Sequence, residues 1–248
     1  MGTIFNLRSY FKWGRKFVND PYHRSGKKIN EIEEAKIPFR YDIINFLIKS
    51  LHRETIYLEI GVRNPNHNFN KISASRKYSV DPGLEFKENP VDFKLTSDEF
   101  FEQLQSGKVL DSDILFDVIF IDGLHTAEQV DRDIQNALKY IKEDGFIVLH
   151  DCNPQTESHA REEHGYRISP AMGAWNGTTW KGFVKWRSNP SIFSCTVDTD
   201  WGVGIISKTK NIGKNTSLKN DFFEFSVFNT HRKDFLNLIS FNELKDLF

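Results

Sequence analysis

The sequence predicts an α/β fold built on a mostly parallel sheet, with an antiparallel hairpin of strands near its C-terminal end. The first observation is the stretch from 116 to 151, which contains a buried strand, an amphipathic helix and a second buried strand. Alternation of strands and helices implies right-handed crossovers between parallel strands. The second observation is a pair of short apolar runs, 192–197 and 202–207, separated by a short polar turn. Runs joined so closely favour antiparallel pairing.

Length and composition are those of a globular protein. The 248 residues suffice for one large α/β domain with added segments, and 39% of them are hydrophobic. We expect a basic helical arm over 1–50, a main domain over 51–210 and a C-terminal extension over 211–248 packed on that domain. The net charge of −1 provides no field that favours nucleic acid. Oligomeric state stays open.

The cysteines and the hydropathy pattern favour a cytoplasmic location. Cys152 and Cys195 are not spaced as a C-x-x-C motif, which suits a reducing compartment. We find no run of about 18 apolar residues and no signal-peptide pattern. We therefore expect a cytoplasmic protein.

The N-terminal arm is strongly basic. Its first thirty residues hold seven basic side chains against one acidic residue, Asp20. Such a segment suits contact with a membrane surface or an anionic partner. We favour the plainer interpretation, a basic helix docked on the edge of the main domain. The apolar side chains that lie among the basic ones are Ile4, Phe5, Leu7, Tyr10, Phe11 and Trp13.

The elements before the central stretch alternate between helical and strand-like patterns. Apolar residues recur at helical spacing before the first strand. Thr96 followed by Glu99 is a capping box, which indicates the start of a helix. The expected elements are a helix at 41–51, strands at 55–62, 77–81 and 91–95, and a helix from Thr96.

The helix between the two central strands is amphipathic. Apolar residues recur at spacings of three and four from Ala127 to Ile141, which places one apolar stripe against a sheet. Residues 152–177 show no sustained period and are polar, which is typical of a lid or binding loop. The elements expected beyond this loop are a helix from Thr178, the hairpin at 192–207, a strand at 222–228 and a helix from His231.

Acidic and imidazole side chains follow both central strands. Asp122 and His125 come after the first strand, and His150 and Asp151 come after the second. Ligands of an open parallel sheet bind outside the carboxyl ends of its strands, and adjacent strands lie about 4.8 Å apart. We therefore expect these four side chains to form a reaction centre. Helix capping or packing is the plainer role of each.

Two kinds of chemistry suit this centre. Asp122, His150 and Asp151 are acceptable ligands for a divalent cation, and carboxylates favour Mg²⁺ or Mn²⁺. Alternatively, His125 or His150 accepts the proton of a substrate hydroxyl, because an imidazole titrates near neutral pH.

A second group of residues precedes the central stretch. The strand at 55–62 runs into a turn with Glu59 two residues before Gly61, and the next strand ends at Asp81. Over roughly residues 55–207 this order of motifs resembles the class I S-adenosylmethionine-dependent methyltransferases. The resemblance implies a Rossmann-like, mostly parallel seven-stranded sheet with helices on both faces and a C-terminal antiparallel hairpin.

The resemblance also implies roles for the residues around that turn. A carboxylate after the second strand accepts two hydrogen bonds from ribose hydroxyls. The chain departs from the family because asparagines stand where further glycines are common, although asparagine tolerates positive φ better than most residues. The implied contacts are Glu59, Gly61 and Asn64 with the methionine part, Asp81 with ribose, Ser97 and Asp98 with adenine, and Asp122 with both cofactor and acceptor.

The reaction centre resembles that of metal-dependent O-methyltransferases, including those that act on macrolide sugars. Those enzymes carry an acid after the fourth strand and an acidic pair after the fifth, where this chain has Asp122 and His150-Asp151. The resemblance implies methyl transfer to a hydroxyl of a small molecule or glycan, such as a surface-polysaccharide sugar, assisted by Mg²⁺ or Mn²⁺. Two alternatives stay open: a cofactor-binding module without activity, and a metal-dependent hydrolase. Helical HD-type phosphohydrolases carry a His-Asp pair within a helix, whereas here the pair follows a strand.

The long loop and its flanks hold further candidates for acceptor binding. Aromatic side chains stack on sugars or aromatic rings, and basic ones bind anions, although packing and solvation are the plainer roles. The aromatic and amide candidates are Trp175, Asn176, Trp180 and Trp201, and the basic ones are His159, Arg161 and His164.

Overall fold

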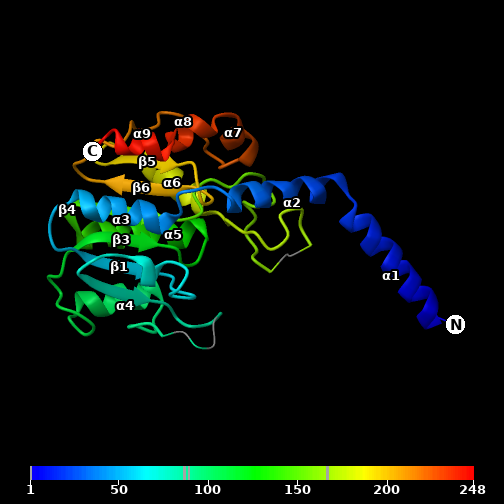
Figure 1. The fold of residues 1–248 in the computed structure, drawn as a ribbon, viewed down its shortest axis with the longest axis horizontal. Helices are drawn as coiled ribbons and strands as arrows, with labels where there is room; N and C mark the ends of the chain where they lie inside the picture. The colour runs from blue at the N-terminus through cyan, green and yellow to red at the C-terminus, as the bar shows by residue number, and fades with distance from the viewer. Residues whose placement is uncertain (1, 86–87, 89, 166–167) are drawn as a thin grey trace.

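The computed structural model describes residues 2–85, 88, 90–165 and 168–248 (Figure 1). The strands are β1 (Ile56–Ile60), β2 (Arg76–Val80), β3 (Phe116–Ile121), β4 (Ile141–Leu149), β5 (Phe193–Val197), β6 (Val203–Ser207) and β7 (Leu238–Ile239). The α-helices are α1 (Gly2–Val18), α2 (Pro21–Glu34), α3 (Arg40–Ser50), α4 (Ser97–Gln105), α5 (Ala127–Tyr140), α6 (Thr179–Arg187), α7 (Phe225–Thr230), α8 (Arg232–Leu236) and α9 (Phe241–Lys245). A 3₁₀ turn, η1 (Phe69–Lys71), follows β1.

One seven-stranded sheet organises the molecule, in the order β2-β1-β3-β4-β6-β5-β7. Strands β2, β1, β3 and β4 pair in parallel, while β6 pairs antiparallel with both β4 and β5. These pairings confirm the predicted Rossmann-like sheet with its antiparallel hairpin. The chain proceeds from β1 outward to β2 and then returns to β3 on the other side. Such a topological switch point is where ligands bind in open α/β sheets.

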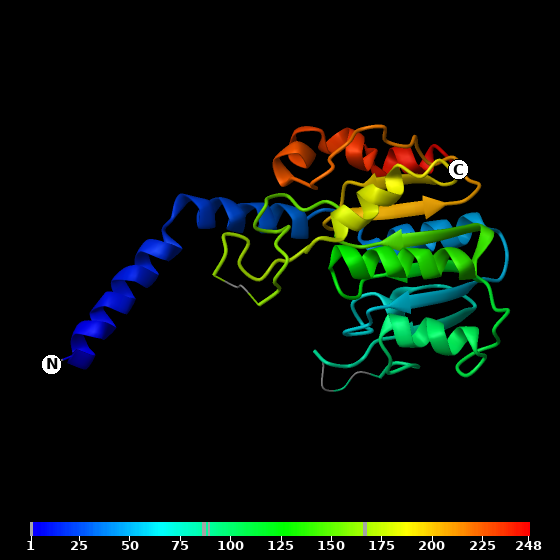
Figure 2. The ribbon, with the colours of Figure 1, turned by 180° about the vertical axis from the view of Figure 1, so that it is seen from behind.

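The two hydrophobic cores lie on opposite faces of this sheet. Successive side chains of a strand point to opposite faces. Ile119 and Ile121 of β3 therefore belong to the core shared with α4, α5 and α6, whereas Val118 and Phe120 belong to the core shared with α3 and α9. All six residues of β3 are buried, as expected for a central parallel strand covered by helices (Figure 2).

The strand predicted at 91–95 is wrong. It contributes one isolated parallel bridge, between Val80 and Phe93. The Asp92 carboxylate accepts hydrogen bonds from the backbone N–H of Ser79 at 2.9 Å and from its hydroxyl at 2.7 Å. The Asp92 side chain therefore binds the backbone N–H of Ser79, a donor that a longer β-ladder would use. The seventh strand is β7, which pairs in parallel with β5 at the opposite edge of the sheet.

The strand predicted at 222–228 is also wrong, because its C-terminal half forms α7. Phe228 is buried, and its ring lies 4.3 Å from that of Trp180, whereas Phe222 is 87% exposed. The aromatic residues of this segment pack as one face of a short helix instead of alternating across a strand.

The N-terminal helices differ in how they meet the rest of the chain. Helix α3 buries Ile43, Ile44 and Leu47 against the sheet. Helix α2 packs on the long loop, and a Cβ on Gly26 would lie 1.9 Å from the carbonyl oxygen of Pro170. Helix α1 projects away from the sheet, as both views show (Figures 1 and 2). The predicted docking of the basic arm on the domain is therefore right for α2 and wrong for α1.

Within the described ranges, no helix combines the length and apolar character that crossing a lipid bilayer requires.

Candidate active site

A cavity of about 500 Å³ lies at the carboxyl ends of β1 to β4. Its position at the switch point is where the topology predicts a ligand, and its volume suits a small molecule. The cavity brings together nine of the ten residues that the sequence predicts. Those nine are Glu59, Gly61, Asn64, Asp81, Ser97, Asp122, His125, His150 and Asp151.

Gly61 shapes the floor of this cavity. It has a φ of 91°, and a Cβ at this position would lie 2.1 Å from the carbonyl oxygen of Asp122. The turn after β1 is fixed by hydrogen bonds from Gly61 N to Val80 O and from Asp122 N to Ile60 O, each 2.8 Å long. The backbones of the first and third strands therefore approach as closely as only glycine allows.

Glu59 lies buried beside that turn. Its Oε2 accepts hydrogen bonds from Tyr57 Oη at 2.6 Å and from Asn68 Nδ2 at 2.8 Å. Burial raises the pKa of the Glu59 carboxyl to about 7, against the effect of these two donors. Sequence reasoning missed Tyr57 and the side-chain role of Asn68. The two-residue spacing of Tyr57 and Glu59, which places both on one face of β1, is the signal that points to their contact.

The residues predicted to bind ribose and adenine fall in two places. Asp81 lies just beyond β2, where its Oδ1 accepts a hydrogen bond from Gly83 N at 2.6 Å. Ser97 lines the cavity at the start of α4, and its Oγ accepts a hydrogen bond from Gln129 at 3.0 Å. Asp98 does not line the cavity, and its carboxylate contacts Gln129 and Arg132 of α5 instead.

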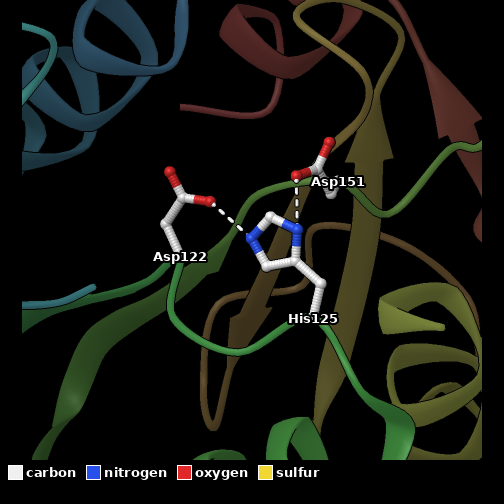
Figure 3. A group of neighbouring side chains, drawn as sticks. All are labelled: Asp122, His125 and Asp151. Carbon is white, nitrogen blue, oxygen red and sulfur yellow. Dashed lines mark hydrogen bonds and ion pairs between the residues drawn. The ribbon is translucent and has the colours of Figure 1, made fainter. Parts of the chain in front are cut away.

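Asp122, His125 and Asp151 converge at the ends of β3 and β4 (Figure 3). His125 Nε2 lies 3.2 Å from Asp122 Oδ1, and His125 Nδ1 lies 3.1 Å from Asp151 Oδ2. The ligand atoms of the three residues all lie within 4.8 Å of one another. Asp151 has a φ of 60°, a strained conformation that clusters at functional sites. These three residues together with His150 are called the acid–histidine centre below.

His150 contacts the same two carboxylates from the other side. Its Nδ1 lies 3.2 Å from Asp122 Oδ1 and 3.1 Å from Asp151 Oδ2. Its Nε2 lies 3.1 Å from Arg40 Nη1 and 3.4 Å from Asp200 Oδ1. Arg40 Nη1 also donates to Asp200 Oδ2 at 3.0 Å. Arg40 comes from α3 and Asp200 from the turn between β5 and β6. Neither residue lies in a sequence pattern that predicts a position in this centre.

The centre is a network of opposite charges. Burial would lower the pKa values of His125 and His150, but the carboxylates around them raise both above the ordinary value. Burial would raise the pKa values of Asp122 and Asp200, but His150 and Arg40 help to lower both. The network therefore favours protonated imidazoles and ionised carboxylates.

The long loop covers one side of the centre. The Trp175 ring stacks on His125 with centroids 5.1 Å apart, and Asn176 Nδ2 donates to Asp151 Oδ1 at 2.7 Å. Trp175 and His164 line the cavity. Asn176 and Trp175 are thus the loop residues that reach the centre.

The other candidates for acceptor binding, in the loop and its flanks, make structural contacts instead. His159 is buried between Thr156 and Asn30 of α2, and burial lowers its pKa to about 4. Arg161 donates to the carbonyl oxygens of Ser158 and Ala174 at 2.7 and 2.8 Å. Trp180 lies in the hydrophobic core, and the Trp201 ring packs at a tilt against His159 with centroids 5.2 Å apart.

The donor set at the centre fits a divalent cation. Two carboxylate oxygens and one imidazole nitrogen suit Mn²⁺ better than Mg²⁺, which prefers oxygen ligands. The sequence predicts His150 as the nitrogen ligand, and its Nδ1 does face Asp122 and Asp151. His125 is a second nitrogen donor, whose ligand atoms lie within 4.8 Å of the same two carboxylates. Arg40 lies on the His150 side, where its positive charge disfavours a second cation. His150 follows β4 and not a helix, which differs from the helical HD-type hydrolases.

Part of the chain matches a known protein family. Residues 58–152 match a family model described as a methyltransferase domain, a range that contains all ten predicted site residues. No curated protein sequence matches the chain.

Several solved structures resemble the fold. An O-methyltransferase from Bacillus cereus, solved with SAH, is 15% identical over 75% of this chain and 89% of its own, with a TM-score of 0.42. A putative caffeoyl-CoA O-methyltransferase from Staphylococcus aureus is 15% identical over 82% and 99% of the two chains, with a TM-score of 0.43. A putative O-methyltransferase from Klebsiella pneumoniae is 16% identical over 75% and 88%, also with a TM-score of 0.43.

Proposed function

We propose that this chain is a class I S-adenosylmethionine-dependent methyltransferase and that it transfers the methyl group to a hydroxyl of a small molecule or glycan. The observation that carries the proposal is one cavity lined both by the turn after β1 and by the acid–histidine centre. A cofactor in the first half would place its methyl group toward the second half. Asp122, at the end of the central strand β3, borders both halves.

The cofactor half is supported by the chemistry of its lining. Asp81 is the proposed partner of the ribose hydroxyls, because a carboxylate accepts two hydrogen bonds. Glu59, Gly61 and Asn64 are the proposed neighbours of the methionine part, and the close approach of Gly61 leaves the backbone accessible there. Ser97 is the proposed adenine neighbour, with Asp98 placed behind it on the helix.

The acceptor half supplies a group that takes the hydroxyl proton. The reaction forms a bond between the acceptor oxygen and the methyl carbon, and it breaks the carbon–sulfur bond, whose electron pair stays on sulfur. An alcohol attacks only as its proton leaves. Asp151 and the carbonyl oxygen of Trp175 both face His125 Nδ1, which keeps a proton there. In our proposal the acceptor hydroxyl replaces Asp122 at Nε2 of the neutral imidazole, the form present above the raised pKa of His125, and Nε2 takes the proton.

A divalent cation is the alternative means of activation. Asp122, His125 and Asp151 would hold it, and when bound it would lower the pKa of the acceptor hydroxyl. His125 Nε2 cannot serve as ligand and proton acceptor at once, so the two roles exclude each other. Chelation therefore distinguishes them.

The acceptor is proposed to stack on Trp175. This ring lines the cavity and lies against His125, which places an aromatic face beside the proposed proton acceptor. Sugars and aromatic alcohols both stack on tryptophan. We favour a glycan hydroxyl, in keeping with the polar lining of this half.

Two measurements test the function in order. Calorimetric titration with S-adenosylmethionine should give micromolar binding, and no binding at millimolar cofactor would overturn the proposal. Transfer of labelled methyl should then be followed with a panel of free sugars, nucleotide sugars and phenolic alcohols. Cofactor binding without transfer to any of them would favour a binding module over an enzyme.

A further inference from the structure

Helix α1 exposes large apolar side chains. Leu7 is 64% exposed, Tyr10 73% and Phe11 75%. The helix projects from the molecule in both views (Figures 1 and 2). The side chains of Ile4 and Phe5 lie outside the described part of the chain. Exposed apolar groups gathered on one element mark a surface that another phase or molecule covers.

These apolar residues form one stripe. Leu7, Tyr10, Phe11 and Gly14 are separated by three, four and seven residues, which places them on one helical face. Together with Arg15 and Asn19 they line a shallow, almost wholly apolar groove. The stripe is therefore continuous from Leu7 to Gly14.

A basic flank runs beside this stripe. Arg8, Lys12 and Arg15 follow one another at spacings of four and three, so they share a second face of α1. Neither Asp nor Glu occurs between Gly2 and Val18. Trp13 is 69% exposed. An apolar face with an aromatic ring, bordered by cations, is the composition of helices that lie in the plane of an anionic bilayer surface.

We infer that α1 docks on an anionic lipid surface, with its apolar stripe in the acyl boundary and its basic flank among the headgroups. Each basic residue near such a surface strengthens binding roughly fivefold. The charge of α1 therefore complements anionic lipid, whereas a second copy of the same basic helix would repel it.

Helix α2 connects this surface to the active-site loop. Asp20 lies between α1 and α2 and is the N-cap residue of α2. Its carboxylate accepts a hydrogen bond from His23 N at 3.2 Å. Along α2, Asn30 contacts His159 at 2.8 Å and the carbonyl oxygen of Ala171 at 3.1 Å. Docking of α1 would thus hold the long loop, with Trp175, near the bilayer. If the proposed function holds, a membrane-borne acceptor would be presented there.

The test is co-sedimentation of the full chain with vesicles. We expect binding to vesicles of equal parts phosphatidylcholine and phosphatidylglycerol, and binding at least about tenfold weaker to phosphatidylcholine alone. Leu7→Ser combined with Phe11→Ser should abolish binding. Arg8→Glu combined with Lys12→Glu should weaken it at least about twentyfold.

Matched controls change the same residue types elsewhere. Phe222→Ser removes a phenylalanine that is 87% exposed, and Lys108→Glu reverses an exposed charge near the end of α4. Neither should alter vesicle binding.

If the wild-type chain stays in the supernatant, or binds both vesicle types equally, the inference is overturned. The inference would also be overturned if the wild-type chain sediments as a dimer and the combined Leu7→Ser and Phe11→Ser changes dissociate that dimer. The stripe would then be an interface between copies of this chain. Calorimetric binding of S-adenosylmethionine should be unchanged in every variant, so this test is independent of the proposed function.

Discussion

Gly61 and Asp122 meet backbone to backbone: a Cβ on Gly61 would lie 2.1 Å from the Asp122 carbonyl oxygen and 2.5 Å from Gly123 N. This contact joins the proposed cofactor half of the cavity to the acid–histidine centre. The distance between the two halves is therefore set by main-chain packing and not by side chains.

Gly61→Ala should destabilise the protein and abolish cofactor binding. A left-handed φ costs a non-glycine residue about 1–2 kcal/mol, and displacement of the Asp122 backbone adds to that cost. Gly107→Ala is the matched control, because Gly107 also has a positive φ, of 68°, but has open space where a Cβ would lie. Urea unfolding should show a larger loss for Gly61→Ala. Equal losses would mean that the close contact with Asp122 is unimportant.

Asp81→Ala should weaken S-adenosylmethionine binding about tenfold or more. The change removes a charged acceptor of hydrogen bonds, each worth about 1.5–3 kcal/mol. Asp113→Ala, in the exposed turn before β3, is the control and should bind normally. Calorimetry measures both. Normal affinity in Asp81→Ala would remove Asp81 from the cofactor site.

His125→Ala should lower the rate of methyl transfer by about 10²–10⁴-fold while cofactor affinity stays near that of wild type. In the wild type the rate should rise as pH passes above about 6.5, because only the neutral imidazole accepts a proton and the neighbouring carboxylates raise the pKa of His125. A rate that is independent of pH from 6 to 9 would contradict a histidine base.

Chelation and the Asp151→Asn change together test whether methyl transfer needs a metal ion. If a cation is held by Asp122, His125 and Asp151, both changes should stop transfer, and added Mn²⁺ should restore the chelated wild type but not the variant. Activity that survives chelation assigns His125 to proton transfer alone. Cofactor titration in the presence of chelator is the control, since the proposed ribose contact of Asp81 does not involve the metal.

Trp175→Ala and Trp180→Ala should separate acceptor binding from packing. Trp175 lines the cavity, so its loss should raise the KM for the acceptor with little effect on stability. Trp180 is 1% exposed and packs against Phe228, so its loss should cost about 3–5 kcal/mol in the free energy of unfolding. Comparable unfolding midpoints for the two variants would contradict this division.

The free energy of unfolding should fall as pH rises from about 5 to 8. The raised pKa values of His125 and His150 give stability that is complete below about 6.5 and is lost as pH rises through their folded values. Glu59, whose pKa is raised to about 7, costs stability once its unfolded form ionises above about 4.5. Glu59→Gln should therefore flatten the slope between pH 5 and 7 in urea unfolding. An unchanged slope would show that the Glu59 carboxyl does not titrate as its burial indicates.

Much of the fold is readable from local pattern. The buried run of β3, the amphipathic α5 and the capping box of Thr96 each produce their own element, because side-chain period and capping act over a few residues. The two strands that were wrongly predicted are segments in which a tertiary contact replaces strand pairing. Asp92 occupies a backbone donor of Ser79, and the tail aromatics pack on Trp180.

The sequence by itself determined which chemical groups follow each strand, and hence that Asp122, His125, His150 and Asp151 gather at one edge of the sheet. Parallel strands end together, so position along the chain suffices for that inference. Only the tertiary structure decided that Arg40 and Asp200 join them, that Asp98 faces α5, and that α1 projects with its apolar stripe exposed. These contacts join segments far apart in the chain, and their geometry follows from how helices pack on the completed sheet.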